Sequence, residues 1–266
     1  MAKDYQDNRC IFCNGKGLSK QHLWPNWIGN IIPREENTNH NINIHIDNLL
    51  DDVVNIKPQV INRQGHAGTR KLRNVCTICN NGWMSELEQV NKANLTALIL
   101  GQSILLNKDD LLNIAEWAVM TSYVREFEDL KTKAIKQRDV LYLMKNELPP
   151  KNWKIYIGRY QGTEYKMRYR HIGVGYAMIN SNYTINMADY EGMNTQYSTF
   201  VVGELIIHAS CTYIDQPVPD VDGKLLSKLN QVWPLKYKKE INLHDKAAIT
   251  DIEADNISNT PISQRN

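Results

Sequence analysis

The spacing of apolar residues predicts three helices in the middle of the chain. From Met84 to Gly101, apolar residues recur with the period of an amphipathic helix. A second helix is predicted over Lys108–Lys131, because Asn107 can cap its first turn and an acidic pair follows there. A third helix is predicted over Asp139–Leu148, since the two prolines that follow it cannot continue a helix.

After these prolines the apolar pattern alternates, which predicts strands. The alternating runs are rich in β-branched and aromatic residues, and Gly, Asn and Asp separate them. The predicted strands are Trp153–Tyr160, Lys166–Ile179, Tyr183–Met187 and Thr199–Tyr213. We expect them to form an antiparallel sheet packed on the preceding helices. A short helix is expected over Leu225–Val232.

The pattern is weaker in the segments on either side of these elements. The stretch Arg34–Asn48 is rich in asparagine and is expected to be a surface excursion rather than part of a core. Val53–Val60 and Arg70–Cys76 alternate enough to be candidate strands. Residues 1–9 are polar and are expected to be flexible, and residues 250–266 are expected to form a disordered tail.

Composition limits the class of protein only broadly. The 266 residues are 42% hydrophobic, which is enough for a core, and no apolar run is long enough to span a membrane. The net charge of +2 does not by itself indicate a nucleic-acid binder. We predict an α+β protein, with a module at residues 10–90 that carries the Asn-rich insertion, followed by a helical and antiparallel β region at residues 91–249.

Four of the five cysteines form two CxxC pairs, Cys10/Cys13 and Cys76/Cys79. Each pair can direct two sulfurs at one tetrahedral zinc, and two pairs are a strong signal for a structural Zn²⁺ site. The alternative is four reduced thiols in a core. A redox site is less favoured without a βαβ context, and the chain start has no apolar signal segment, so we expect a cytoplasmic protein without disulfides. Cys211 is expected to be an ordinary buried thiol.

Zinc bound to both pairs would bring His22 close to Asn80, which directly follows the second pair. A neutral imidazole can take a proton from water near pH 7, and an amide oxygen is a suitable ligand for Mg²⁺. Such an ion would hold a phosphate oxygen while His22 activates the nucleophile. Structural alternatives remain open: His22 as a buried histidine among tryptophans, and Asn80 and Asn81 as helix-capping residues.

Three stretches, Cys10–Cys13, Leu18–Ile28 and Val75–Glu88, together resemble a known family. They are similar to the zinc-containing HNH endonucleases, in particular to the bacterial subgroup with a CNNGWMS-type second knuckle. The resemblance implies a treble-clef-like ββα-metal core, zinc held by the four cysteines, and a catalytic Mg²⁺ or Mn²⁺ at the start of the helix. It assigns the general base to His22 and the last metal-binding position to Asn80. It also implies hydrolysis of phosphodiester bonds, in double-stranded DNA, in a setting such as phage defence or a mobile element.

The chain departs from the family pattern at three points. The position before the histidine is commonly an acid or a second histidine, and here it is Gln21, which would bind the catalytic metal without a negative charge. The central asparagine of the pattern is replaced by Lys71, and Asn74 is out of register. The segment between His22 and Cys76 is longer than a hairpin needs, which requires the insertion.

Two other classes of function stay open on the sequence alone. The basic residues Arg70, Lys71 and Arg73 could be a solvated face or could contact phosphates. A zinc-stabilised nucleic-acid-binding module that has lost cleavage is therefore one rival, and a protein-interaction domain is another. The region at residues 91–249 could recognise DNA, bind a partner or pair two protomers as a homodimer. His66 and Asn81 are candidate accessory residues.

Overall fold

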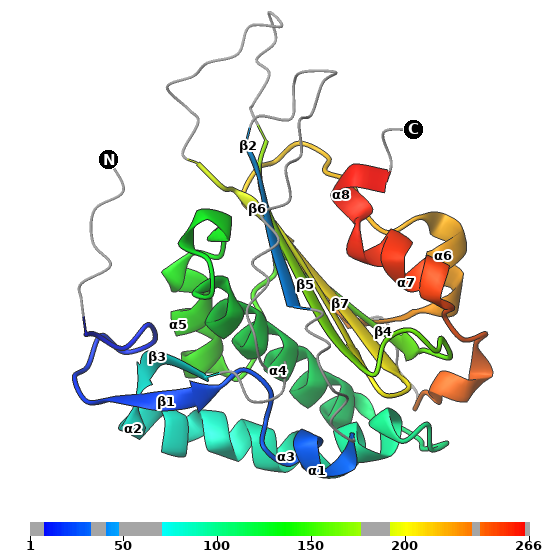
Figure 1. Cartoon of the computed structure of the whole chain (residues 1–266), viewed down its shortest axis with the longest axis horizontal. Coiled ribbons are helices and arrows are strands. Elements are labelled where there is room, and N and C mark those ends of the chain that lie inside the picture. The colour runs from blue at the N-terminus through cyan, green and yellow to red at the C-terminus, as the bar shows by residue number, and fades with distance from the viewer. Residues whose placement is uncertain (1–7, 33–40, 48–70, 177–191, 236–239, 264–266) are drawn as a thin grey trace, which may run out of the picture.

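The computed structural model describes residues 8–32, 41–47, 71–176, 192–235 and 240–263, which form two β-sheets and a set of helices (Figure 1). The small sheet pairs β1 (Leu18–His22) with β3 (Lys71–Cys76) in antiparallel orientation. The large sheet has the strand order β2-β5-β6-β7-β4-β8. Its strands are β2 (Asn41–Asp47), β4 (Trp153–Arg159), β5 (Met167–Gly175), β6 (Thr195–Val202), β7 (Leu205–Thr212) and β8 (Asn230–Trp233).

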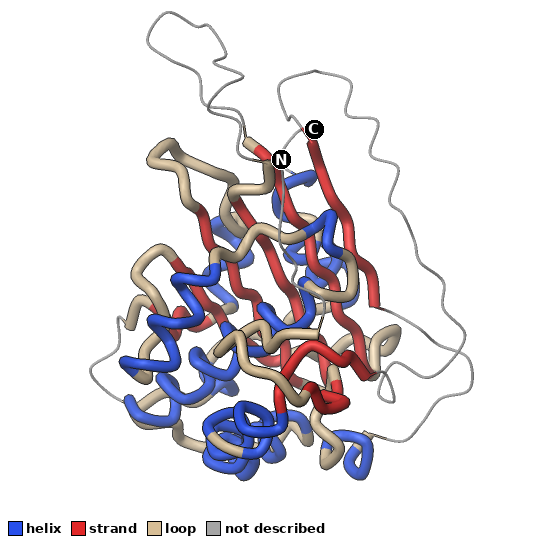
Figure 2. The backbone as a smooth tube through the Cα atoms, turned by 90° about the vertical axis from the view of Figure 1, so that its left-hand side faces the viewer, coloured by secondary structure: helices blue, strands red, loops and turns tan. Residues whose placement is uncertain are grey.

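Helices cover both faces of the large sheet, and the small sheet lies beside the long helices (Figures 1 and 2). The helices are α1 (Ile28–Ile31), α2 (Thr77–Asn81), α3 (Trp83–Ile99), α4 (Lys108–Glu126), α5 (Gln137–Asn146), α6 (Gly223–Lys228), α7 (Asp251–Ser258) and α8 (Thr260–Ser263). Helix α4 packs on one face of the sheet and α7 on the other. None of the helices in the described part of the chain combines the length and the apolar character needed to cross a bilayer.

Helix α4 is the central helix of the fold, and its start is where the sequence predicts it. Asn107 accepts hydrogen bonds from the N–H groups of Asp109 and Asp110, and Asp110 Oδ2 accepts one from Asn107 N, which completes a capping box. Every residue from Ile114 to Glu126 is buried. A helix buried on all sides needs tertiary partners all round, so α4 lies inside the fold rather than on its surface.

The alternating strands are explained by a sheet that is buried on both faces. Ile155 and Ile157 of β4 belong to the core on the α4 side, whereas Tyr156 between them packs in the core on the α7 side. In β7, Ile207 and Ile206 divide between the same two cores. Apolar side chains at both odd and even positions of these strands are therefore buried, because both faces of the sheet are covered.

Two expectations about the outer segments are wrong. The stretch expected to be a surface excursion contains β2, which pairs in parallel with β5 at an edge of the otherwise antiparallel sheet, and Ile44 is buried. Isoleucines alternate with polar residues across Asn41–Asp47. The two-residue period of a strand was therefore present in the sequence, although the segment is rich in asparagine.

The tail expected to be disordered instead forms α7 and α8. Thr250 caps α7, and Glu253 completes a capping box with it, so a local start signal was present. Ala254 and Ile257 are buried against the second face of the sheet. The tail is ordered because that apolar face requires a cover.

Other boundaries differ from the prediction as well, and the second predicted helix ends at Glu126 rather than at Lys131. The run Thr199–Tyr213 is a hairpin, since Gly203 and Glu204 form a two-residue turn between β6 and β7, with φ of 53° at Gly203. The helix expected over Leu225–Val232 ends earlier, as α6, and its last residues form β8. The predicted strands Val53–Val60 and Tyr183–Met187 lie outside the described residues.

Gly173 in β5 lies in close contact with the backbone at Thr132. A Cβ atom at this position would clash with the carbonyl group of Thr132, which belongs to a short 3-10 helix over Leu130–Thr132. We expect Gly173→Ala to lower the free energy of unfolding by about 2 kcal/mol, because backbone must move to admit the methyl group. Gly223→Ala is the control, since a methyl group at that position would meet nothing within 4 Å. Equal unfolding free energies for the two variants in urea titrations would contradict this interpretation.

Candidate metal centre

Four cysteine sulfurs come together beside the small sheet. Cys10 and Cys13 lie in the turns before β1, and Cys76 and Cys79 lie where β3 passes into α2. All four Sγ atoms lie within 4.8 Å of one another, and those of Cys13 and Cys76 are 3.5 Å apart. A tetrahedral zinc with Zn–S bonds of about 2.3 Å places its sulfurs about 3.8 Å apart. The cluster could therefore hold a structural metal such as zinc, as the sequence predicts.

Both CxxC turns direct backbone N–H groups at a sulfur. Gly15 N donates to Cys13 Sγ at 3.4 Å, and Cys79 N donates to Cys76 Sγ at 3.4 Å. Asn14 has a φ of 59° and closes the first turn in the left-handed region. Donors of this kind favour the thiolate form, which is the form that binds a metal.

The four thiols differ in how readily they ionise. Burial raises the pKa of the Cys76 thiol, but hydrogen bonds from the Cys79 N–H and from the other thiols outweigh it and lower the pKa to about 7. Burial raises the pKa of Cys10, and burial together with neighbouring thiols raises the pKa of Cys79. A metal that binds here displaces protons from buried thiols, so its affinity is expected to increase with pH.

Asn80, which follows the last cysteine, lies against strand β1. Its Nδ2 donates to Ser19 Oγ at 3.2 Å, and Ser19 Oγ donates to the Val75 carbonyl at 3.1 Å. This chain of bonds joins α2, β1 and β3. Among the described residues no hydrogen bond engages the Asn80 side-chain oxygen, so this oxygen is available as a ligand.

Gln21, the residue before His22 in β1, lies close to helix α3. Its side chain is buried, and Nε2 donates to the His22 carbonyl at 3.2 Å. The Gln21 side chain also lies near Glu88 of α3. Burial raises the pKa of Glu88 to about 7, and the nearby Gln21 amide opposes the rise. Sequence reasoning missed Glu88 as a site residue, because its nearness to Gln21 depends on how α3 packs against the hairpin.

His22 is the last residue of β1 and lies opposite Lys71 in the antiparallel register. Burial, and then the charge of Lys71, lower the pKa of His22 below its ordinary value of about 6.5. Its Nδ1 is buried, and no described residue forms a hydrogen bond with it. No described hydrogen bond joins His22 to Asn80, so the fold brings Asn80 to β1 without linking it to the imidazole.

The other candidates fall into three groups. Three are exposed on the hairpin and at the end of α2: Lys71, Arg73 and Asn81. Two lie outside the described residues: His66 and Arg70. Asn74, the out-of-register asparagine, is buried, and its Nδ2 donates to the Val124 carbonyl at 3.4 Å. Asn74 therefore holds the hairpin against α4.

A buried arginine supports the segment that follows His22. Arg125 of α4 is fully buried, and its Nη2 donates to the Leu23 carbonyl at 2.7 Å. Its guanidinium lies 4.2 Å from the ring centroid of Trp24 and 4.3 Å from that of Tyr169. Arg125 thus connects the end of β1 to the large sheet through cation–π contacts and a charge-assisted hydrogen bond.

A histidine, a serine and a glutamate, which are residue types often found in catalytic sites, form a network inside the core. His171 Nδ1 lies 2.8 Å from Ser198 Oγ, and His171 Nε2 lies 3.4 Å from Glu126 Oε1. All three residues are fully buried, and Glu126 also accepts hydrogen bonds from the N–H groups of Ala134 and Ile135. A substrate has no access to this serine, so the network stabilises the core between the sheet and α4.

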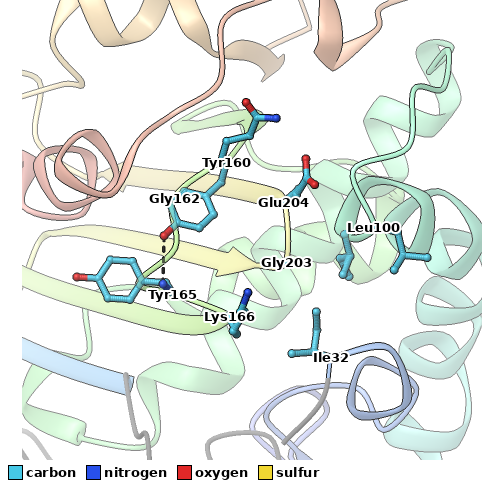
Figure 3. Close-up of a pocket in the computed structure, with 10 residues that line it drawn as sticks. Ile32, Leu100, Tyr160, Gly162, Tyr165, Lys166, Gly203 and Glu204 are labelled. Carbon is cyan, nitrogen blue, oxygen red and sulfur yellow. Dashed lines mark hydrogen bonds between the residues drawn. The ribbon is translucent and has the colours of Figure 1, made fainter. Parts of the chain in front are cut away.

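A cavity of about 650 Å³ lies at the far end of α3. Lys166 and Glu204 face it from two neighbouring turns of the sheet, and Ile32 and Leu100 form its apolar side (Figure 3). The 17 residues of α3 separate it from the cysteine cluster by about 25 Å along the helix axis. This cavity is therefore distinct from the candidate metal centre.

Comparison with known proteins adds no assignment. No family model matches the chain, and no curated protein or solved structure matches it either. Any function must therefore be inferred from the residues and their arrangement.

Proposed function

We propose that this protein is a metal-dependent endonuclease that hydrolyses phosphodiester bonds in double-stranded DNA. The observation that supports the proposal is the four-cysteine cluster, which holds the strand ending in His22 against the helix that carries Asn80. Zinc would be structural here, because four thiolates close its coordination sphere and leave no position for substrate.

The proposed catalytic metal is Mg²⁺ or Mn²⁺, and β1 together with helices α2 and α3 offers suitable ligands. Asn80 and Gln21 would provide carbonyl oxygens, and Glu88 would provide the negative charge that Gln21 lacks. When bound, the ion would stabilise charge on the phosphate and the leaving oxygen. The raised pKa of Glu88 fits this role, because a carboxyl group that is costly to ionise alone gains from a nearby cation.

His22 would act as the general base in this scheme. Its lowered pKa keeps the imidazole neutral at pH 7, so it can accept a proton from the attacking water. Lys71, which lies opposite it, would hold a phosphate of the same strand. A DNA backbone lying across the end of the hairpin would reach both groups.

We expect the zinc-loaded protein to cut plasmid DNA with Mg²⁺ or Mn²⁺, and His22→Ala to cut it at least about 100-fold more slowly. The rate should stay high down to about pH 6.5 and fall only below it, since the pKa of His22 is lowered. The matched control is His244→Ala, which removes an exposed histidine at another site. Equal cutting by wild type and His22→Ala would refute the mechanism.

A nucleic-acid-binding module without cleavage is the second candidate, and the exposed basic residues Lys71 and Arg73 favour it. Phosphate contacts by these residues would make binding fall steeply with salt. DNA binding of that kind, without cutting at any divalent-metal concentration, would select this function over the nuclease. A protein-interaction role would be indicated if no DNA affinity were measured at low salt.

A further inference from the structure

A second cavity, of about 370 Å³, lies between helices α3, α4 and α5. Its volume is within the range of small-molecule sites. Part of its wall is apolar, formed by Trp83 and Leu87 from α3, Leu112 from α4 and Met144 from α5. Nothing in the proposed nuclease mechanism uses this cavity.

Four carboxyl groups line the cavity, and no basic residue is among its described lining. They come from all three sides: Glu86 of α3, Asp109 and Glu116 of α4, and Glu147 at the end of α5. No ion pair is described for any of the four. The cavity therefore combines an apolar part of its wall with carboxyl groups for which no ion pair is described.

Glu116 is the informative member of the four. It is only 7% exposed, and no hydrogen bond or ion pair is described for its side chain. Burial, and then the charge of Glu147, raise the pKa of Glu116 to about 7. The Glu116 oxygens are not among the fully buried unpartnered atoms of the described residues, so they are accessible from the cavity that Glu116 lines. A carboxyl group whose ionisation is costly alone gains from a cation bound beside it.

We propose that the cavity binds an organic cation, an ammonium or guanidinium group on a hydrocarbon stem, with Glu116 accepting its hydrogen bonds. The apolar part of the wall would cover the stem, and Glu86, Asp109 and Glu147 would attract the charge. Two sources share this chemistry: a free alkylamine, and a lysine or arginine side chain of a polypeptide. The inference is independent of the nuclease proposal, because it uses neither the hairpin nor a catalytic metal.

The test is calorimetric titration of the full zinc-loaded chain at pH 8, without DNA or added divalent metal. The probes are n-hexylammonium, the neutral analogue 1-hexanol, and a blocked alanine pentapeptide with one central lysine. We expect hexylammonium to bind at least about tenfold more tightly than hexanol, and Glu116→Gln to remove at least about tenfold of that affinity. Glu147→Gln, a second variant at the mouth of the cavity, is expected to weaken binding about threefold.

The control is Glu240→Gln, which makes the same change of charge at an exposed site outside the cavity and should leave binding unchanged. Binding of the peptide as well as the amine would support a polypeptide source, and binding of the amine alone would support a small molecule. The proposal is overturned if no cation binds, if hexanol binds as well as hexylammonium, or if neither glutamine variant in the cavity weakens binding.

Discussion

Cys79→Ser is expected to abolish stoichiometric zinc binding and to lower the Tm by about 10 to 20 °C. The buried Cys79 sulfur is one of four within 4.8 Å of one another, and a tetrahedral site does not keep its affinity with three of its thiolates. Loss of the metal removes the link between the two CxxC turns and leaves buried polar groups without a partner, at a cost of about 5 kcal/mol.

The matched control for this prediction is Cys211→Ser. Cys211 is equally buried, in β7, but lies outside the cluster, so the variant should keep one zinc per chain. Metal content by elemental analysis and Tm by calorimetry measure the two effects. A strong chelator should lower the Tm of the wild type and leave that of Cys79→Ser unchanged. If the wild type contained no metal, or if chelation did not change its Tm, the four cysteines would not form a structural metal site.

Arg125→Lys is expected to lower the free energy of unfolding by about 3 to 4 kcal/mol. A lysine cannot lie flat between Trp24 and Tyr169, and it cannot keep the hydrogen bond that Arg125 donates to the Leu23 carbonyl in the same geometry. Loss of desolvated cation–π contacts costs about 2 kcal/mol, and loss of a charged hydrogen bond costs about 1.5 kcal/mol or more.

Arg138→Lys is the control for the arginine prediction, because the Arg138 side chain is 71% exposed and surface changes of this kind stay within about 0.5 kcal/mol. Unfolding in urea measures both variants. If the chain is a nuclease, Arg125→Lys should also slow cutting, since Leu23 directly follows His22. A stability equal to that of Arg138→Lys would show that the guanidinium does not hold the end of β1.

Both predictions depend on one continuous core. Phe12, between the first two cysteines, is fully buried, with its ring 5.0 Å from that of Trp83 and 5.5 Å from that of Tyr123. The Tyr123 hydroxyl donates to the Ile11 carbonyl at 3.3 Å. The same apolar cluster extends from Cys10 to the large sheet. Damage to the cysteine cluster is therefore expected to spread to α4 rather than to remain local.

Sequence motifs whose residues lie within a few positions of each other could be recognised from the sequence alone. The CxxC pairs indicated a four-sulfur cluster, and Asn107 marked the start of α4. The third helix was also predicted, but it ends at Asn146, before the prolines that were expected to stop it. Thr250 and Glu253 were a signal of the same short range, but the polar composition of the tail obscured it. The helices and most of the sheet could be predicted because helix and strand periods are properties of contiguous residues.

The amino-acid sequence by itself determined the period of each element and the residue types available for binding a metal. Only the tertiary structure decided that Glu88 lies near Gln21, that His22 lies opposite Lys71, and that Glu116 lines a cavity between three helices. It also decided that β2 and α7 join the large sheet. The reason is physical: such contacts join residues distant in the chain, and the packing of whole faces selects them rather than any local preference.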